Sequence, residues 1–380
     1  MKLKELCKIK HGFAFKGKDI IKNYSTKYVL VTPGNFNIGG GFKKEKCKYF
    51  SENGNIPKDY ILRENDLIVT MTDLSVKSDT LGYSALIPKD NNIYLHNQRI
   101  GLVYDIDESK VLKDYLYWFM RSKKYQQEVV ASQSGTAIHH TSPARILNIE
   151  IDLPSIDNQR KIVEILSDVE HKIKNNNDTN NNLYEISKQL LLKYLDENKS
   201  SDEINISKFL NIFTGKKNAN ETSPTGKYKF FSCAPESLLS DTYLCDSAAI
   251  IVAGNGAYTG RTRFYDGKFE LYQRTYGLTL KDGFEKNNIY GLYVFMKTIF
   301  EPDKMGGTHG SAIPYIVLSD LTDYKLKYNK VEFDRFSNLV SGNIKMIQEN
   351  EKSNEKLSEL RDTLLPKLMN GEINLDNIEI

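Results

Sequence analysis

The chain contains one long helical pattern twice, and this repeat limits its possible folds more than any other feature. The copies run from about residue 159 to 195 and from about residue 333 to 369. Each copy carries a stripe that recurs at alternating steps of four and three residues, which is the spacing of a coiled-coil seam. The two stripes have the same register and comprise Ile162, Leu166, Val169, Ile173, Asn176, Asn180, Leu183, Ser187, Leu190 and Tyr194 in the first copy, and Phe336, Val340, Asn343, Ile347, Asn350, Asn354, Leu357, Arg361, Leu364 and Leu368 in the second.

Asparagines interrupt both apolar stripes at matching places. Asn176 and Asn180 break the first stripe, and Asn350 and Asn354 break the second. An asparagine on a seam lowers stability but fixes the register, because a slipped pairing buries its amide without a partner. An alternative is that residues 175–182 form a solvated loop between two short helices. That alternative accounts for the first copy but does not predict the matching pair in the second.

The segment before the first long helix, up to about residue 152, has the pattern of a mixed α/β domain. Its β-rich runs are separated by clusters of Gly, Asn and Pro. One amphipathic helix is predicted over 111–131, with Trp118 in the core. The predicted strands are 27–32, 66–72, 100–106 and 146–154.

A second segment repeats this plan in a shorter form. It follows a polar linker at 196–203 and extends from 204 to about 330. Its tripeptide Tyr-Gln-Arg at 272–274 matches Asn-Gln-Arg at 97–99. The other matching pairs are 206–217 with 3–18, 248–254 with 66–72, 289–300 with 111–131, and 310–321 with 135–146.

A repeat of this length sets the architecture. The predicted fold class is α+β, with two pseudo-repeated mixed α/β domains separated by a two-helix antiparallel coiled coil. The helices are expected to be antiparallel because the segments that connect them are whole domains. At ~1.5 Å per residue each helix is roughly 50 Å long, so the pair would hold the domains a fixed distance apart. The predicted boundaries are 1–155 and 201–330 for the domains, and 156–200 and 331–380 for the helices.

Composition describes an ordinary soluble globular protein of two or three domains, with 380 residues, 40% hydrophobic and 27% charged. The net charge of +3 does not by itself require a nucleic-acid partner. Neither a membrane-spanning apolar run nor a signal-peptide core is expected. The cysteines lack CxxC spacing, so neither a zinc ribbon nor a disulfide framework is expected, and a reducing, cytoplasmic setting fits best.

Two similar domains at a fixed separation suit a ligand with two sites at a fixed spacing. Duplex DNA is the obvious example, because half-sites recur about every helical turn, ~34–36 Å apart. Arginine can bond guanine through its fork, and asparagine or glutamine can bond adenine. The candidate DNA-binding residues in predicted loops are Lys16, Lys18, Asn35, Asn37, Lys43, Lys44, Gln98, Arg99, Gln133, Thr136 and His139 in the first domain, and Lys216, Lys217, Asn255, Tyr258, Arg261, Arg263, Gln273, Arg274, Lys304, His309 and Ser311 in the second.

Motifs at the ends of the helices point to a family. The first helix is entered through 153–166, LPSIDNQRKIVEIL, and the second ends in 359–373, ELRDTLLPKLMNGEI. The arrangement resembles the specificity (S) subunit of type I restriction-modification systems, which carries a Leu-Pro before a Gln and a basic, Ile-rich opening, and a closing Leu-rich stretch before Gly-Glu-Ile. Asn158 stands where that family usually has Glu, and the second helix has 327–336, KYNKVEFDRF, in place of a Leu-Pro opening.

The resemblance implies a non-catalytic subunit whose two target-recognition domains each read one half of a bipartite, asymmetric double-stranded DNA target. It also implies two modification (methyltransferase) subunits, which carry S-adenosylmethionine and methylate adenine. Two restriction subunits, translocases with a nuclease that use ATP and Mg, would complete the complex. No cofactor is expected on this chain. The long helices would set the spacing and dock the modification subunits.

Two other functions are weighed against this one. Asp303, Asp323 and Lys325 formally fit a PD…(D/E)xK nuclease pattern, which would hold Mg²⁺. A two-headed scaffold that does not bind DNA is the other alternative. The segment 254–260 resembles a dinucleotide loop, but 261–269 reads as a hairpin where such a loop must open a helix. The histidines lack metal-ligand spacing, so no catalytic or metal site is predicted.

Overall fold

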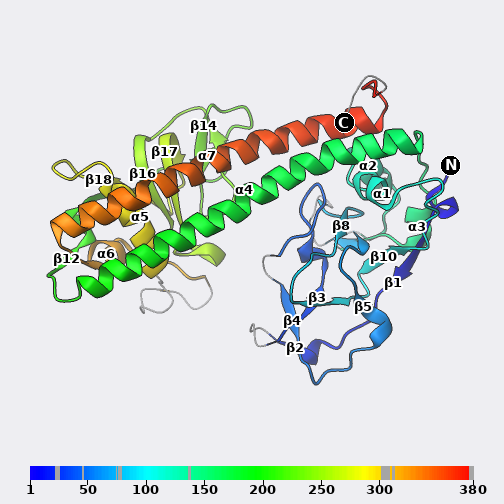
Figure 1. The fold of residues 1–380 in the computed structure, drawn as a ribbon, viewed down its shortest axis with the longest axis horizontal. Coiled ribbons are helices and arrows are strands. Elements are labelled where there is room, and N and C mark those ends of the chain that lie inside the picture. The colour runs from blue at the N-terminus through cyan, green and yellow to red at the C-terminus, as the bar shows by residue number, and fades with distance from the viewer. Residues whose placement is uncertain are drawn as a thin grey trace. The chain divides into compact units, whose positions relative to one another are not determined.

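The chain divides into two compact units. Unit 1 is Met1–Lys172 with Lys356–Ile380, and unit 2 is Ile173–Glu355. Each unit holds one mixed α/β domain and the adjoining halves of two long helices (Figure 1), so the predicted fold class is confirmed. The computed structural model describes residues 1–21, 26–44, 47–73, 75, 79–135, 138–300, 309 and 313–375.

Both long helices are continuous. α4 spans Ile156–Glu197 and α7 spans Lys330–Met369. Because α4 passes through residues 175–182 without a break, the alternative of a solvated loop is wrong. No seam position predicted on either helix is exposed. One detail differs, since Leu191 rather than Leu190 is the fully buried residue of its turn.

The asparagines of the two helices pair in unit 2. Asn176 Nδ2 donates to Asn354 Oδ1 at 2.8 Å, and Asn350 Nδ2 donates to Asn180 Oδ1 at 2.8 Å. Each asparagine therefore bonds the repeat counterpart of its neighbour, which is the pattern of an antiparallel pair around a local two-fold axis. A slip of one turn would break both bonds, so this is the geometry expected of residues that fix the register.

Two sheets form the domain of unit 1. Their strand orders are β1-β10-β6-β8 and β2-β4-β3-β9-β5, and a separate ladder joins β11 to β7. Only β3 and β9 run parallel among these strand pairs of the described residues. The strands are β1 Lys8–His11, β2 Ile20–Ile21, β3 Tyr28–Val31, β4 Lys48–Phe50, β5 Ile61–Leu62, β6 Leu67–Thr70, β7 Thr72–Asp73, β8 Ser84–Leu86, β9 Ile93–His96, β10 Ile100–Tyr104 and β11 His139–His140.

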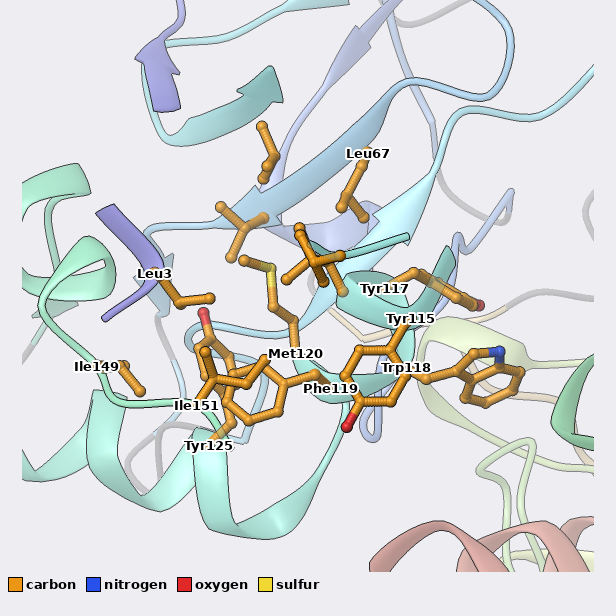
Figure 2. Packing of buried hydrophobic residues seen from close by; sticks show 14 of the residues in the cluster. Leu3, Leu67, Tyr115, Tyr117, Trp118, Phe119, Met120, Tyr125, Ile149 and Ile151 are labelled. Carbon is orange, nitrogen blue, oxygen red and sulfur yellow. The ribbon is translucent and has the colours of Figure 1, made fainter. Parts of the chain in front are cut away.

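Aromatic side chains of two short helices fill the main core of unit 1 (Figure 2). Phe119 and Tyr125 lie with ring centroids 5.4 Å apart, and Trp118 is 1% exposed, which confirms its predicted place in the core. Ile162 of α4 and Leu368 of α7 belong to the same cluster, so the long helices are part of this core. The helices of unit 1 besides α4 and α7 are α1 Lys113–Phe119, α2 Lys123–Ala131, α3 Pro143–Leu147 and the 3₁₀ turns η1 Leu3–Glu5, η2 Gly17–Asp19, η3 Pro33–Asn35 and η4 Lys58–Tyr60.

One six-stranded sheet, ordered β13-β18-β16-β17-β14-β15, forms the domain of unit 2. β12 and β19 pair with each other in a separate two-stranded sheet. The elements are β12 Glu203–Asn205, η5 Ile206–Lys208, β13 Leu210–Thr214, β14 Tyr228–Phe231, β15 Leu238–Ser240, β16 Cys245–Ala253, η6 Gly256–Tyr258, β17 Thr262–Leu271, β18 Thr275–Leu280, α5 Asn288–Ile299, α6 Leu318–Thr322 and β19 Lys325–Lys327.

The two domains share one strand plan, as the sequence repeat predicts. β1, β10, β6 and β8 of unit 1 correspond in order to β13, β18, β16 and β17 of unit 2. The parallel pair β3–β9 corresponds to β14 with the end of β17. Because β17 is a single strand of 10 residues, unit 2 joins into one sheet what unit 1 divides between two.

Two predictions about local structure in unit 1 are wrong. The segment 111–131 is two helices, because the Ser122 hydroxyl accepts a bond from Tyr125 N and thereby caps a new helix, α2. The segment 146–154 is not a strand. It contains the end of α3 and then extended chain, whose Glu150 makes an isolated bridge.

A third prediction fails in unit 2. The segment 261–269 is not a hairpin around Asp266 and Gly267, because β17 continues through it. β16 pairs with β17 on both sides of this point, with Ser247 opposite Gly267. A Gly at φ +135° is therefore accommodated inside a strand, where its lack of a Cβ permits that backbone angle.

Candidate nucleic-acid interface

In each domain the second strand of the sheet, β10 or β18, runs from a turn towards the long helices. β10 follows the turn at 97–99, and the chain beyond its far end bonds the side chain of Gln159 on α4. β18 follows the turn at 272–274, and its far end packs in the core that contains Phe333 of α7. We call the turn end of each sheet, which is the end away from the helices, the loop edge.

Three separate segments meet at the loop edge of unit 1. The carbonyl of Arg99 accepts a bond from Met71 N at 2.9 Å, and the carbonyl of Met71 accepts one from Thr141 N at 3.0 Å. Ser134 and His140 bond each other in both directions, at 2.9 Å each. The backbone thus holds the end of β6, the turn before β10 and the segment before α3 in one place.

The loop edge of unit 2 has the same bonds at the equivalent residues. The carbonyl of Arg274 accepts from Gly254 N at 2.8 Å, and the carbonyl of Gly254 accepts from Ile316 N at 2.9 Å. His309 and Tyr315 bond each other in both directions, at 2.8 and 2.9 Å. The repeat therefore extends to individual hydrogen bonds, although few of the side chains match.

Many of the predicted DNA-binding residues lie on or next to the loop edges with side chains that are exposed or half-exposed. In unit 2, the Arg261 guanidinium lies 5.5 Å from the ring centroid of Tyr258, an arrangement that keeps a cation beside an aromatic face. Asn255 pairs with Tyr315 and accepts a bond from the Cys233 thiol at 3.1 Å. The candidates gathered here are Gln98, Arg99 and Gln133 in unit 1, and Lys216, Asn255, Tyr258, Arg261, Gln273, Arg274 and His309 in unit 2.

A second group of candidates lies around η2 and in the chain between β3 and β4 of unit 1. Lys16 and Lys18 are exposed around η2, and Asn37 is exposed in the turn at 37–41. Lys44 forms an ion pair with Asp90 at 2.8 Å. Lys43 is half-buried in the same stretch of chain. The structure therefore does not bring these residues to the loop edge.

Two cationic candidates of unit 2 are already engaged within the protein. The Arg263 guanidinium donates to the carbonyls of Ser232, Ala234 and Pro235, and its burial lowers its pKa to about 10. It thereby fixes the segment 232–235, which is a structural role. Lys217 likewise donates to two hydroxyl groups and lies 3.4 Å from the carboxylate of Glu270. Neither side chain is free to meet a base in this conformation.

Two further candidates are buried, which corrects their expected place in exposed loops. Asn35 is fully buried because its amide bonds the carbonyl of Lys43 and the backbone of Thr32. His139 is 8% exposed, since it lies in the ladder of β11 with β7. Thr136, Lys304 and Ser311 lie outside the described residues.

Sequence reasoning missed a buried charge cluster in unit 1. Arg121 is 3% exposed and donates to Glu170 of α4, to the Tyr117 hydroxyl and, at 2.9 Å, to the carbonyl of Gly39. Glu170 also lies 3.5 Å from Arg361 of α7. The cluster thus ties the turn at 37–41 to both long helices. Its only signal in the sequence is an arginine that directly follows the apolar run 115–120.

Asp303, Asp323 and Lys325, which make up the nuclease pattern, do not form a cluster within the described part of the chain. Asp303 lies outside the described residues, the Asp323 carboxylate accepts a bond from Thr322, and Lys325 lies 3.9 Å from Glu203. In the described part of the chain, no group of three or more His, Cys, Asp or Glu side chains is placed to hold a metal ion. Among the same residues, no helix has the length and apolar character to cross a membrane.

Comparison with known proteins places this geometry in a family. Residues 1–185 match the family model described as the type I restriction modification DNA specificity domain. The EcoDI type I restriction enzyme specificity subunit of Escherichia coli is 32% identical over 123 residues, which are 32% of this chain and 26% of that protein. The MjaIX specificity subunit of Methanocaldococcus jannaschii is 20% identical over 317 residues, 72% of each protein.

The match to individual relatives is partial. The chain spans 26% and 39% of the length of the EcoDI and MjaVIII specificity subunits. Its fold is similar to that of the type I restriction-modification S subunit from M. genitalium, with a TM-score of 0.57, 18% sequence identity and coverage of 97% of this chain and 95% of that one. Residues 1–185 therefore match the type I restriction modification DNA specificity domain, and the chain as a whole has the fold of a type I restriction-modification S subunit.

Proposed function

We propose that this chain is the sequence-specific DNA-binding subunit of a type I restriction-modification complex. Each domain reads one half of an asymmetric, bipartite duplex target, and the helix pair sets the gap between the halves. The observation that supports this most is the pair of loop edges, which share their backbone hydrogen bonds but differ in most side chains. One scaffold that presents two sets of side chains suits a target with two unlike halves.

The reading side chains are those that differ between the domains. Asn255 and Arg261 at the loop edge of unit 2 have the donor groups that recognise adenine and guanine in the major groove. Asn37, exposed in unit 1, has the same capacity towards adenine. Side chains that recognise bases have to differ between the two domains, because the two half-sites differ in sequence.

The chain acts in this proposal without catalysis and without a cofactor of its own. Adenine methylation belongs to two modification subunits that carry S-adenosylmethionine and dock on the long helices. Cleavage belongs to two restriction subunits that use ATP and Mg. The assembly works in the cytoplasm, where it defends the cell against foreign DNA.

The direct test is the pattern of methylated adenines in cells with and without this chain, each expressing the modification subunit. Methylation at one bipartite sequence, present only with the chain, is the expected result. Methylation at unrelated sites, or none, would contradict the proposal. If the chain alone cleaved DNA with Mg²⁺, and lost this activity in Asp323→Ala, the nuclease alternative would replace it.

Exchanging one domain should change one half of the target only. Replacing residues 1–152 with the first domain of another family member should alter one half-site and keep the other half and the gap, because each domain carries its own loop edge. Sequencing of methylated sites measures this directly. A change in both halves would mean that the domains do not read independently.

A further inference from the structure

The two loop edges differ in most side chains, but they carry the same Gln-Arg pair in the same turn. In unit 1, Gln98 N donates to the carbonyl of Phe13 at 2.9 Å. In unit 2, Gln273 N donates to the carbonyl of Lys217, also at 2.9 Å. Both turns therefore stand against the first strand of their sheet and place an arginine next, Arg99 or Arg274.

A glycine directly after that first strand makes the approach possible in both units. A Cβ added to Gly12 would lie 2.1 Å from the carbonyl oxygen of Asn97, and one added to Gly215 would lie 2.0 Å from that of Leu271. Any other residue would push the turn away. The position of the arginine is thus built into each domain independently of the variable side chains around it.

Both arginine side chains are exposed, and neither forms an ion pair with a described residue. This separates them from Arg121 and Arg263, whose guanidinium groups are bonded within the protein. Within the described part of the chain, two guanidinium groups at equivalent places on two loop edges therefore have no ionic partner.

An arginine that both domains carry should contact a feature that both half-sites have. Half-sites of different sequence have different bases but the same phosphodiester backbone. We propose that Arg99 and Arg274 each bind a backbone phosphate in their own half-site, and so position the domain on the duplex without reading a base. The guanidinium fork suits two phosphate oxygens and forms strong, charge-assisted hydrogen bonds. This inference rests on the proposed function.

The place of the turns favours DNA over a protein partner. Each turn lies at the end of β10 or β18 that is away from the long helices, and the helices are the surface proposed to dock the modification subunits. In unit 2 the neighbouring segments of the loop edge carry Asn255 and Arg261, which are proposed to read bases. A phosphate contact beside them would fix the distance from which those side chains reach the groove.

The experiment uses the chain assembled with its modification subunits and measures binding to target and random duplexes across a salt series. Arg99→Ala and Arg274→Ala should each weaken binding to both duplexes by the same factor, roughly tenfold. The slope of log affinity against log salt should fall by about 0.9 for each arginine. The double variant should multiply the two losses, because the contacts are in separate half-sites. Lysine at either position should restore the slope.

Matched controls are Arg63→Ala and Lys286→Ala, which remove exposed cations elsewhere on each domain and should leave affinity and slope unchanged. A changed base preference in one half-site would make the arginine a base reader. Weaker assembly with the modification subunits at unchanged DNA affinity would make it a protein contact. Unchanged affinity and slope would also overturn the inference. Each of these outcomes is separate from failure of the proposed function, in which the unaltered complex itself would show no preference for a target.

Discussion

Glu170→Ala should lower the free energy of unfolding of unit 1 by about 3–5 kcal/mol, the usual cost of removing one partner of a buried ion pair. Arg121 is 2% exposed in its side chain, so its charge stays buried when the carboxylate is gone. Burial alone would lower the pKa of Arg121, but the Tyr117 and Glu170 groups beside it raise the pKa instead. In the variant the guanidinium loses Glu170 but stays charged, because arginine is not deprotonated in proteins.

Urea unfolding of the full chain measures the change in stability. Hydrogen exchange in α1 and in the first part of α4 then shows whether the change falls in unit 1. Glu164→Ala, at an exposed position of the same helix, is the control and should change stability by less than about 0.5 kcal/mol. The double variant Arg121→Met with Glu170→Leu should recover more than half of the loss, since it leaves no unpaired charge. If Glu170→Ala matched Glu164→Ala, the ion pair would have no structural importance.

The same variant bears on recognition. The Arg121 Nε–H bonds the carbonyl of Gly39, and a Cβ at Gly40 would lie 2.5 Å from the Arg121 side chain. Gly39, Gly40 and Gly41 all have φ between 84° and 89°, angles that other residues rarely adopt. The turn that exposes Asn37 is thus shaped by glycines and held by the buried arginine. Loss of the ion pair should therefore make the turn at 37–41 more mobile, in addition to destabilising the core of unit 1.

The long helices and the repeat are the part of this fold that the sequence predicts best. An apolar stripe that recurs over many turns indicates a long helix packed against a partner helix, and each further turn adds evidence for that helix. The asparagines strengthened the prediction, because the matched interruptions by Asn176 and Asn180 and by Asn350 and Asn354 are not expected of a solvated loop. Asn176 and Asn354 bond each other at 2.8 Å. Elements of this length depend little on tertiary detail, which is why the helical patterns at 159–195 and 333–369 match the ends of α4 and α7 to within three residues.

The errors fall where short-range signals compete with tertiary ones. The amphipathic pattern at 111–131 did not reveal that a single serine cap starts a second helix at Ser122. An Asp-Gly pair usually marks a turn, but pairing of β16 with β17 kept it inside a strand. Candidate site residues were chosen by type and expected loop, and burial is a property of the folded chain. Asn35 and Arg263 have suitable chemistry for DNA, yet their side chains bond their own backbone neighbours.

Lengthening both long helices by one heptad should move the complex to a new target with a wider gap. Duplicating 173–179 in α4 and 351–357 in α7 adds facing segments, so the antiparallel seam and its asparagine pairs are kept. Seven residues add about 10 Å of helix, which corresponds to at most about three base pairs of duplex. Both half-sites should keep their bases, because neither loop edge is changed. Sequencing of methylated sites gives the gap directly.

Duplicating the segment in α4 alone is the control that separates spacing from simple damage. The insert then has no counterpart in α7, so on one side of it the asparagines face apolar or charged positions and lose their amide partners. This variant should methylate neither the old target nor one with a wider gap. An unchanged gap after insertion in both helices would show that something other than the helix pair measures the distance. A wider gap with both half-sites intact would assign that role to the seam, since the helices are the only elements altered.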